Sequence, residues 1–438
     1  MHRSTAIAKL ALLLLATAAV SCGFFVVAHA HARKSCWPHE RDALLALKQG
    51  INDTYGVLAS WQKLRHDCCR WTGVACSNKT GHVTELDIDY SSLLGQISPS
   101  LLSLQHLEYL DLSFTSLLGP NGSSVFPDFL SSLHNLRHLD LSSTLFSGRL
   151  PARLSNLSNL EYLDLSSTLF SGRLPARLSN LSNLEYLDLS STLFSGTLPP
   201  QLGNLSNMRH LDLSYMQNIH TADVSWLTHL HFLEHLDMSG INLGTTDMFP
   251  VANTIPTLKD LILSNCSLPN ANQPLKHLNL TRLEWLDLNR NHLRHRIDTS
   301  WFWNITGITH LDLDETYLHG PFPDALGGMT SLQFLSFANN GNSATMMVDL
   351  KNLCDLELLR LDGSLAFGNI TEFLKKLPQC SSNKFLSLLS NHNNMTGMLP
   401  DMVGHLTSLG QLSLSNNSIT GAIPSGLLLK RIAQAIML

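Results

Sequence analysis

LSSTLFSGRLPARLSNLSNLEYLD runs from Leu141 to Asp164 and recurs unchanged from Leu165 to Asp188, so one unit of 24 residues is repeated within the chain. An L-x-L pattern returns along the sequence at spacings of 24 to 29 residues. Its first leucine, called the frame leucine below, stands at Leu86, Leu110, Leu139, Leu163, Leu187, Leu211, Leu236, Leu261, Leu286, Leu311, Leu335, Leu359, Leu388 and Leu412. Fourteen units at this period predict a solenoid, in which each repeat buries its apolar face against its neighbours.

Each unit has the pattern of a leucine-rich repeat. In Leu110-Asp111-Leu112 the leucines point to one face of a short strand and the aspartate points to the other. Five residues after the frame leucine, a small polar side chain can bind backbone groups at the turn that leaves the strand. This position holds Asn291, Asn340, Asn393, Asn417, Cys266, Thr144, Thr168 and Thr192. The pattern predicts an α/β solenoid, a right-handed leucine-rich repeat superhelix with a parallel sheet on its concave face.

The first 30 residues predict a secretory signal peptide. Basic residues precede an apolar run that ends at Ala28-His29-Ala30, a small-x-small cleavage site. The alternative is a membrane anchor, but polar residues interrupt the run. Because no later stretch holds 18 uninterrupted apolar residues, we expect no membrane insertion after cleavage. The expected destination is the extracellular space or cell wall, or the plasma membrane if a longer form carries an anchor.

Composition argues against nucleic acid as a partner. Charged residues make up 14% of the chain, the formal net charge is -5, and no basic stripe is present. The 21 histidines are numerous enough to change the balance of charge, because a mildly acidic compartment would protonate many of them. We therefore expect solubility and partner choice to depend on pH.

Four cysteines, Cys36, Cys68, Cys69 and Cys76, lie before the first repeat. In a secreted chain such a cluster predicts disulfides. Residues 38–48 between them have the spacing of a short amphipathic helix that would pack on the first repeat. A zinc site is disfavoured because the C-C-x6-C spacing has no second paired knuckle. The segment is thus expected to cap the first leucine layer.

The cap element CCRWTGVAC at residues 68–76, followed by repeats with S-G-x-L-P, resembles the plant extracellular leucine-rich repeat family. This family comprises receptor-like proteins, receptor kinases and polygalacturonase inhibitors, and the chain is most similar to receptor-like proteins of the elicitor-receptor, disease-resistance type. The resemblance implies bonds between Cys36 and Cys68 and between Cys69 and Cys76. Cys354 and Cys380 resemble a cysteine pair of the elicitor-receptor branch; the alternative is two buried thiols.

Twelve N-x-S/T sequons predict a glycosylated outer surface. Ten are expected to accept sugars: Asn52, Asn78, Asn121, Asn156, Asn180, Asn204, Asn279, Asn304, Asn369 and Asn394. Three of these, Asn156, Asn180 and Asn204, hold equivalent positions and should line one flank. Asn265 and Asn416 lie next to the turn residue and are expected to be too crowded.

No catalytic motif is present in the sequence. It contains no Walker loop, G-x-S-x-G elbow, H-E-x-x-H pair or kinase signature, so we expect no enzyme, no metal and no cofactor. The closely spaced His229, His231 and His235 should diverge, because only His235 falls on the strand. The aspartate that follows many frame leucines recurs once per repeat, and its simplest interpretation is a solvated position on the sheet.

The residue before the frame leucine is aromatic or histidine in nine repeats: Tyr109, His138, Tyr162, Tyr186, His210, His235, Trp285, His310 and Phe334. Strands about 4.8 Å apart would align these rings in a column beside the aspartates. Aromatic groups provide hot-spot contacts, and carboxylates select basic or hydroxyl-rich partners. The predicted ligand-binding residues are Tyr162, Asp164, Tyr186, Asp188, His210, Asp212, His235, Asp237, Trp285, Asp287 and His310. The alternative is that both columns are solvated consensus positions.

The resemblance to this plant family implies an extracellular recognition protein in plant defence or development. Its expected partners are a peptide, protein or glycan ligand and a membrane co-receptor kinase. The alternative is an inhibitor of microbial polygalacturonase, although inhibitors of that kind have fewer repeats and a closed C-terminal cap. We expect a signal peptide over 1–30, a cap over 31–81, the repeats over 82–425 and an apolar tail over 426–438, without a C-terminal cap, transmembrane segment or kinase domain.

Overall fold

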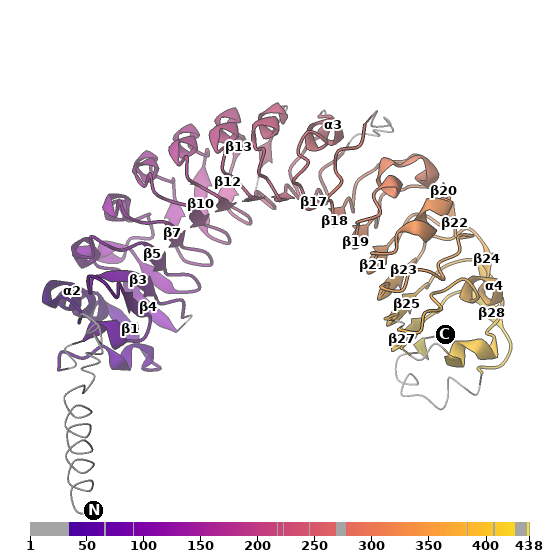
Figure 1. The fold of residues 1–438 in the computed structure, drawn as a ribbon, viewed down its shortest axis with the longest axis horizontal. Helices are drawn as coiled ribbons and strands as arrows, with labels where there is room; N and C mark the ends of the chain where they lie inside the picture. Colours follow the sequence, from indigo (N-terminus) through magenta and orange to yellow (C-terminus); the bar gives the residue numbers. More distant parts are fainter. Residues whose placement is uncertain are drawn as a thin grey trace, which may run out of the picture.

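A computed structural model describes residues 35–424 and 436–437, except residues 65, 66, 91, 217, 222, 245, 269–276, 383, 406 and 407. The expected signal peptide and most of the expected tail lie outside the described residues. The described chain forms an arch with strands along its inner side and short helices along its outer side (Figure 1). The predicted leucine-rich repeat solenoid with its sheet on the concave face is confirmed.

Within the described residues, one sheet of sixteen strands lines the concave side. Its strands are β2 (Val74–Cys76), β3 (Val83–Asp87), β5 (Tyr109–Asp111), β7 (His138–Asp140), β9 (Tyr162–Asp164), β11 (Tyr186–Asp188), β14 (His210–Asp212), β16 (His235–Asp237), β17 (Asp260–Ile262), β18 (Trp285–Asp287), β19 (His310–Asp312), β21 (Phe334–Ser336), β23 (Leu358–Arg360), β25 (Ser387–Leu389), β27 (Gln411–Ser413) and β29 (Ile436–Met437). Only the pair of β2 with β3 is antiparallel among these described strands.

The register of this sheet matches the frame leucines one to one. Leu86 pairs with Leu110, and the same alignment continues strand by strand to Leu412. Leu359 pairs with Leu388, so Leu388 rather than Leu386 carries the frame there. Beyond the expected end of the repeats, Ile436 of β29 pairs with Leu412. The segment expected to be only an apolar tail thus contributes a further strand to the sheet.

Short strands and helices form the outer layer and the flanks. The strands are β1 (Ile51–Asp53), β4 (Leu93–Gln96), β6 (Ser116–Leu118), β8 (Ser147–Gly148), β10 (Leu169–Gly172), β12 (Leu193–Phe194), β13 (Gly196–Thr197), β15 (Ile219–His220), β20 (Gly320–Pro321), β22 (Ala344–Thr345), β24 (Gly368–Asn369), β26 (Met395–Met398) and β28 (Ser418–Thr420). The α-helices are α2 (Pro38–Gln49), α3 (Met248–Ala252) and α4 (Ile370–Leu374). The 3-10 helices are η1 (Val57–Ser60), η2 (Cys68–Arg70), η3 (Pro99–Ser103), η4 (Pro120–Gly122), η5 (Asp128–Ser132), η6 (Ala152–Asn156), η7 (Ala176–Asn180), η8 (Pro200–Asn204), η9 (Ser225–His229), η10 (Ile297–Thr299), η11 (Trp301–Asn304), η12 (Asp324–Gly328) and η13 (Asp401–His405).

Buried side chains at the turn after each strand hold neighbouring repeats together. Asn291 is fully buried; its Oδ1 accepts the N–H groups of Cys266 and Leu268 at 3.1 and 3.0 Å, and its Nδ2 donates to the Leu263 carbonyl at 2.7 Å. Thr168 makes a smaller contact, since its hydroxyl donates only to the Leu165 carbonyl at 2.6 Å. The predicted turn function therefore has a strong form with asparagine and a weaker form with threonine.

The cap covers the first leucine layer as expected. Helix α2 buries Leu44 and Leu47, while Glu40 is fully buried and accepts the N–H of Val83 at 3.0 Å. Three disulfides are present in the described chain, and they join the cysteine pairs named above: Cys36 with Cys68, Cys69 with Cys76, and Cys354 with Cys380. The two cap disulfides fix the segment that follows α2 against the start of the sheet.

The asparagine side chains of all twelve sequons are exposed, as glycosylation requires. Asn156, Asn180 and Asn204 end the adjacent helices η6, η7 and η8, so they lie along one flank as predicted. Asn265 and Asn416 are exposed as well, and the crowding expected for them is not found. Occupancy by sugar stays a prediction.

Candidate ligand-binding face

The rings before the frame leucines form one stacked column over the first half of the sheet. Six of them, called the ring ladder below, are Tyr109, His138, Tyr162, Tyr186, His210 and His235. Neighbouring ring centroids lie 3.9 to 4.2 Å apart, with interplanar angles of 6° to 13°. The parallel register places equivalent residues of adjacent strands side by side, and flat rings at that spacing stack on one another.

Stacking changes what the ring ladder offers to a ligand. Each interior ring uses both faces for its neighbours and is half-buried, so mainly ring edges are directed into the concavity. Those edges carry hydroxyl and imidazole groups, which favour hydrogen bonds over broad apolar contact. The sequence argument had assigned large contact area to these aromatics, and the structure lowers that expectation for Tyr162, Tyr186 and His210.

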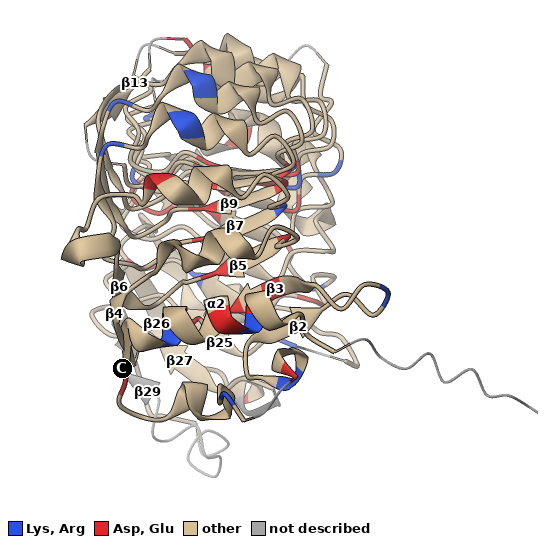
Figure 2. Cartoon of the chain, turned by 90° about the vertical axis from the view of Figure 1, so that its left-hand side faces the viewer, with Lys and Arg blue, Asp and Glu red and all other residues tan. Residues whose placement is uncertain are grey.

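The aspartates are not solvated, and this corrects the interpretation made from the sequence. Asp111, Asp140 and Asp164 are buried, whereas Asp188 and Asp212 are half-buried. In each repeat Oδ1 accepts the backbone N–H two residues later; the distance from Ser190 N to Asp188 Oδ1 is 2.8 Å. The acids recur along the strands labelled β5 and β9 in Figure 2. They stabilise the end of each strand and present fewer free oxygens than expected.

Burial makes these carboxyls weak acids. Burial, with the neighbouring Asp212 carboxylate, raises the pKa of Asp188 to about 7, and burial with Asp314 raises the pKa of Asp312 to about 7. Burial also raises the pKa of Asp140 and that of Asp287 to about 6. At Asp188 the carboxylates of Asp212 and Asp164 oppose ionisation, because these like charges are separated by only one strand spacing.

Two histidines of the ring ladder respond in the opposite direction. Burial lowers the pKa of His138 and that of His210 to about 4, so both stay neutral in a mildly acidic medium. Burial likewise lowers the pKa of His295. The expected gain of positive charge therefore does not occur at His138 and His210. On lowering the pH, the concave face instead loses negative charge from its aspartates.

Strand β17 interrupts both columns. It carries Asp260 before the frame leucine, where the strands on either side carry the rings of His235 and Trp285, and Ile262 after it, where those strands carry an aspartate. His235 Nδ1 lies 3.0 Å from Asp260 Oδ2, and these side chains are 22% and 33% exposed. On the far side of Asp260, Trp285 is 42% exposed and stacks only on His310, at 4.6 Å, among the described rings. This segment, His235, Asp260 and Trp285, is called the ladder break.

The ladder break combines two features that ligand sites use. One face of the Trp285 indole has no ring against it, so a large apolar surface is available to a partner. In the described chain the Oδ1 atom of Asp260 makes no hydrogen bond, so it can accept one from a donor on a ligand. Sequence reasoning included Trp285 and His235 but omitted Asp260, although the missing aromatic at that position was visible in the repeat alignment.

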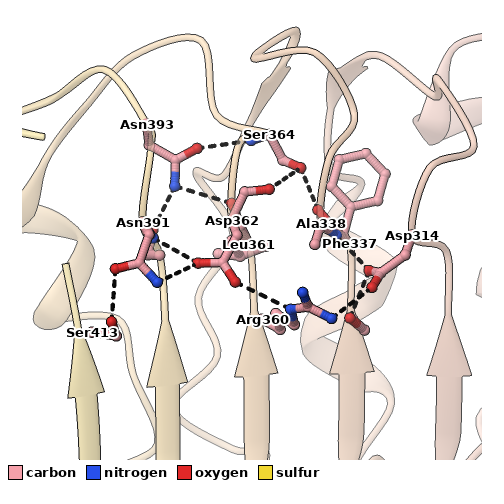
Figure 3. Close-up of polar contacts among 12 residues, drawn as sticks. Asp314, Phe337, Ala338, Arg360, Leu361, Asp362, Ser364, Asn391, Asn393 and Ser413 are labelled. Atoms are coloured by element: carbon pink, nitrogen blue, oxygen red, sulfur yellow. Dashed lines mark hydrogen bonds and ion pairs between the residues drawn. The ribbon is translucent and has the colours of Figure 1, made fainter. Parts of the chain in front are cut away.

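A second polar cluster, further along the sheet, was missed altogether. Arg360 lies between two acids, with Nη1 3.0 Å from Asp314 Oδ2 and Nε 3.1 Å from Asp362 Oδ2 (Figure 3). Asn391 donates to Asp362 at 2.8 Å and accepts from Ser413 at 2.7 Å. An arginine in place of the usual aspartate was the available signal. These charged and polar groups use their hydrogen-bonding atoms on one another. The cluster therefore stabilises the strands and leaves few free donors or acceptors for a ligand.

Two arrangements bear on the possibility of a metal. In the described chain, ligand atoms of Asp111, His138 and Asp140 lie within 4.8 Å of one another. Both Oδ1 atoms already accept backbone N–H groups at 2.8 Å, which leaves this group poorly suited to an ion. His229 and His235 do diverge: His229 Nδ1 lies 3.3 Å from the Trp226 carbonyl, and His235 turns to Asp260.

Comparison with known proteins identifies the family. A model described as a leucine-rich repeat region matches residues 88–250, and one described as a leucine rich repeat N-terminal domain matches residues 38–77. Receptor-like protein EIX1 of Solanum lycopersicum is 30% identical over 324 residues, which cover 70% of this chain and 26% of that protein. The chain belongs to the plant leucine-rich repeat receptor-like family. Leucine-rich repeat receptor-like ectodomains of this family are typically non-enzymatic.

Other relatives of this receptor-like chain give the same result. Receptor-like protein EIX2 of Solanum lycopersicum is 29% identical over 405 residues, covering 88% of this chain and 34% of that protein. The chain thus spans about a quarter to a third of the length of these two relatives. The crystal structure of PEPR1-AtPEP1 matches with a TM-score of 0.66 at 25% identity, over 89% of this chain and 56% of that one. Among the described residues, no helix has the length and apolar character needed to cross a membrane.

Proposed function

We propose that this chain recognises an extracellular peptide ligand on its concave face, and that the ladder break anchors the ligand. The observation that carries the proposal is the half-open indole of Trp285 beside the partly exposed carboxyl of Asp260. Exposed tryptophans are the residues most often found at binding hot spots. Family membership, and the similarity to the PEPR1-AtPEP1 structure, support a ligand-binding role.

The chemistry of the ladder break indicates what the peptide should contain. Asp260 faces the concavity with a free oxygen and would accept a hydrogen bond from a basic or hydroxyl side chain. An apolar side chain one or two positions away would cover the Trp285 indole. The ring edges from Tyr162 to His210 would then provide hydrogen bonds along the rest of an extended backbone. A peptide fits this row of evenly spaced polar edges better than a glycan does.

A co-receptor kinase at the membrane is the second proposed partner, in defence or developmental signalling. Support for it comes only from the family, because the described chain itself contains no kinase and no spanning helix. A bound peptide on the concave face would present part of its own surface to such a partner.

The test is a selection from a random peptide library on the purified chain. We expect enriched peptides to share a basic residue near an apolar one, and to lose binding to the variants Trp285→Ala and Asp260→Asn. Phe232→Ala is the matched control, since Phe232 is 52% exposed but lies outside the ring column. Enriched peptides that bind all three variants equally would contradict the proposal. Inhibition of a fungal polygalacturonase by the chain would favour the inhibitor alternative instead.

A further inference from the structure

An apolar groove lies on the outer side of the arch, where Figure 1 shows β24, β28 and α4. It has a volume of about 380 Å³ and is lined by Met346, Met347, Phe367, Phe373 and Met395, among others. The side chains of Met347 and Phe367 are 65% and 64% exposed, unusually high for large apolar residues in this chain. A soluble repeat protein normally covers such a surface or uses it for binding.

Two sequon asparagines, Asn369 and Asn394, line the same groove. Asn369 lies on β24 and pairs with Thr396 of β26. Phe367 precedes Asn369 by two residues, and both residues line the groove. Met398, 61% exposed, follows Thr396 by two residues. Asn369 is therefore placed between two exposed apolar side chains.

The backbone at the start of α4 fixes how Asn369 is oriented. Its Oδ1 accepts the N–H groups of Thr371 and Glu372 at 2.9 and 3.3 Å. N-glycosylation attaches the sugar to Nδ2 and leaves Oδ1 free to keep both hydrogen bonds. The asparagine is exposed in spite of this cap. A sugar on Asn369 would thus begin at a fixed position beside Phe367.

Carbohydrate has the right chemistry to cover this surface. One face of a pyranose ring carries mainly C–H groups, and these are attracted to the negative face of an aromatic ring. Among the twelve sequons, Asn369 alone has an exposed phenylalanine two residues before it; Phe302 precedes Asn304 in the same way but is buried. We propose that the first sugars of a glycan on Asn369 pack on Phe367 and fill the groove.

This glycan would act as part of the outer surface. It would shield Phe367, Met347 and Met398 from other chains without adding protein mass. The proposal depends on passage through the secretory pathway and is independent of the ligand site, which lies on the concave side. Sugars held against protein are also less accessible to enzymes than sugars that extend into water.

The experiment uses the full chain secreted from a eukaryotic host. Asn369→Asp removes the sequon but keeps an oxygen acceptor for both amides of α4, and Asn394→Asp removes the neighbouring sequon as the matched control. We expect Asn369→Asp to raise the fluorescence of an apolar dye several-fold, with Asn394→Asp equal to the unchanged chain. Site-specific mass spectrometry should show the Asn369 glycan resisting an endoglycosidase longer than the Asn394 glycan does, and Phe367→Ala should abolish that difference.

Three outcomes would overturn the proposal. They are absence of glycan at Asn369 in the secreted chain, increased dye binding in Asn394→Asp alone, and equal rates of glycan release at both sites before Phe367 is replaced. Melting curves identify any variant that fails to fold. The rates at which the endoglycosidase releases the two glycans are compared on the unchanged chain, so this comparison does not depend on a variant that folds.

Discussion

From Tyr109 to His235 every ring stacks on the ring of the neighbouring strand, whereas at Asp260 the stacking stops and Trp285 is left with an open side. The two regions share the same strand spacing and frame leucines, so the difference lies entirely in the side chains before and after each leucine. Where the repeat is regular, the rings stack on one another and the carboxyls accept backbone N–H groups. Where it is irregular, surface becomes available. In a repeat protein, positions that depart from the pattern are therefore the better candidates for binding.

The turn residues extend this comparison, and they give the largest expected effect. The duplicated repeats use Thr168, whose hydroxyl makes one hydrogen bond, whereas the repeat that carries Trp285 of the ladder break uses the buried Asn291. Asn291→Ala should lower the free energy of unfolding by about 2 to 5 kcal/mol, because it leaves the N–H groups of Cys266 and Leu268 buried without an acceptor. Thr168→Ala should cost about 1 kcal/mol.

Urea unfolding followed by circular dichroism measures both changes. Repeat arrays can unfold in parts, so the transition should be recorded by intrinsic tryptophan fluorescence as well. Equal losses for Asn291→Ala and Thr168→Ala would mean that the two kinds of turn are energetically equivalent, and the distinction between the regions would fail.

The next largest effect concerns binding. Trp285→Ala should weaken the binding free energy of a selected peptide by about 2 kcal/mol or more, which is the range of a hot spot. Tyr186→Ala should weaken it by less than about 1 kcal/mol, because only the edge of that ring is free. Calorimetric titration of the two variants gives both numbers. A larger loss for Tyr186→Ala would move the anchor into the ring ladder.

Much of this architecture could be predicted from the sequence, because it depends on period alone. The frame leucines specified the register of all fourteen repeats, including Leu388 where the spacing is 29 residues. The columns on the concave face followed from that register. The burial and ionisation of the side chains in these columns did not follow from it. Alternation along a strand shows which face a side chain occupies, but not how deeply its neighbours cover it. Asp188 was expected in water and is half-buried for this reason.

The polar cluster around Arg360 shows a second limit. Its contacts join residues from four different repeats, so no single repeat contains the signal. Reading down a column, instead of along a repeat, would have shown an arginine where other repeats have an aspartate. Asp260 was missed in the same way, because the search looked for aromatic residues and passed over the strand that lacked one.

The aspartate column gives a prediction for pH. Burial and Asp212 raise the folded-state pKa of Asp188 from 3.8 to about 7, so folding favours the protonated form. Stability from this group is highest at low pH and declines as pH rises from near 4 through 7. His138 and His210, with folded-state pKa values lowered from 6.5 to about 4, act in the opposite direction between those limits. Above pH 6.5 the aspartates act alone.

We therefore expect the melting temperature to fall between pH 6.5 and about pH 8. Asp188→Asn keeps an oxygen acceptor for the Ser190 N–H and removes the ionisation. It should raise the melting temperature near pH 8, raise it less near pH 5, and leave it unchanged below about pH 3.8, where Asp188 is protonated in both states. Asp298→Asn is a suitable control, since its arginine partner lowers the pKa of that carboxyl. A melting temperature for Asp188→Asn that matches the unchanged chain throughout would show that the column does not oppose its own ionisation.

The smallest effect is expected from the charged residues just before the rings. In the ring-ladder region Arg137 pairs with Glu161, and both side chains are well exposed. Nearer the ladder break, Glu234 bonds both Arg209, at 2.9 Å, and Lys259, at 2.6 Å, and its bond to Lys259 together with Arg209 lowers its pKa. Exposed pairs are screened by water and salt, so Arg137→Ala should change the free energy of unfolding by less than about 0.5 kcal/mol.

Glu234→Gln should cost somewhat more, up to about 1 kcal/mol at low salt, because one carboxylate pairs with two cations. After the replacement Arg209 keeps its pair with Glu185, at 3.4 Å, whereas Lys259 loses its hydrogen-bonded carboxylate. The loss should shrink in high salt as screening grows. Because the folded-state pKa of Glu234 is lowered, its contribution is present at neutral pH and disappears as the pH falls through that value. Urea titrations of both variants at two salt concentrations test this order. A larger, salt-independent loss for Arg137→Ala would mean that the aliphatic part of its side chain packs on the neighbouring ring of Tyr162. The stability of the ring ladder would then depend on the charged residues just before the rings as well as on the stacking of the rings themselves.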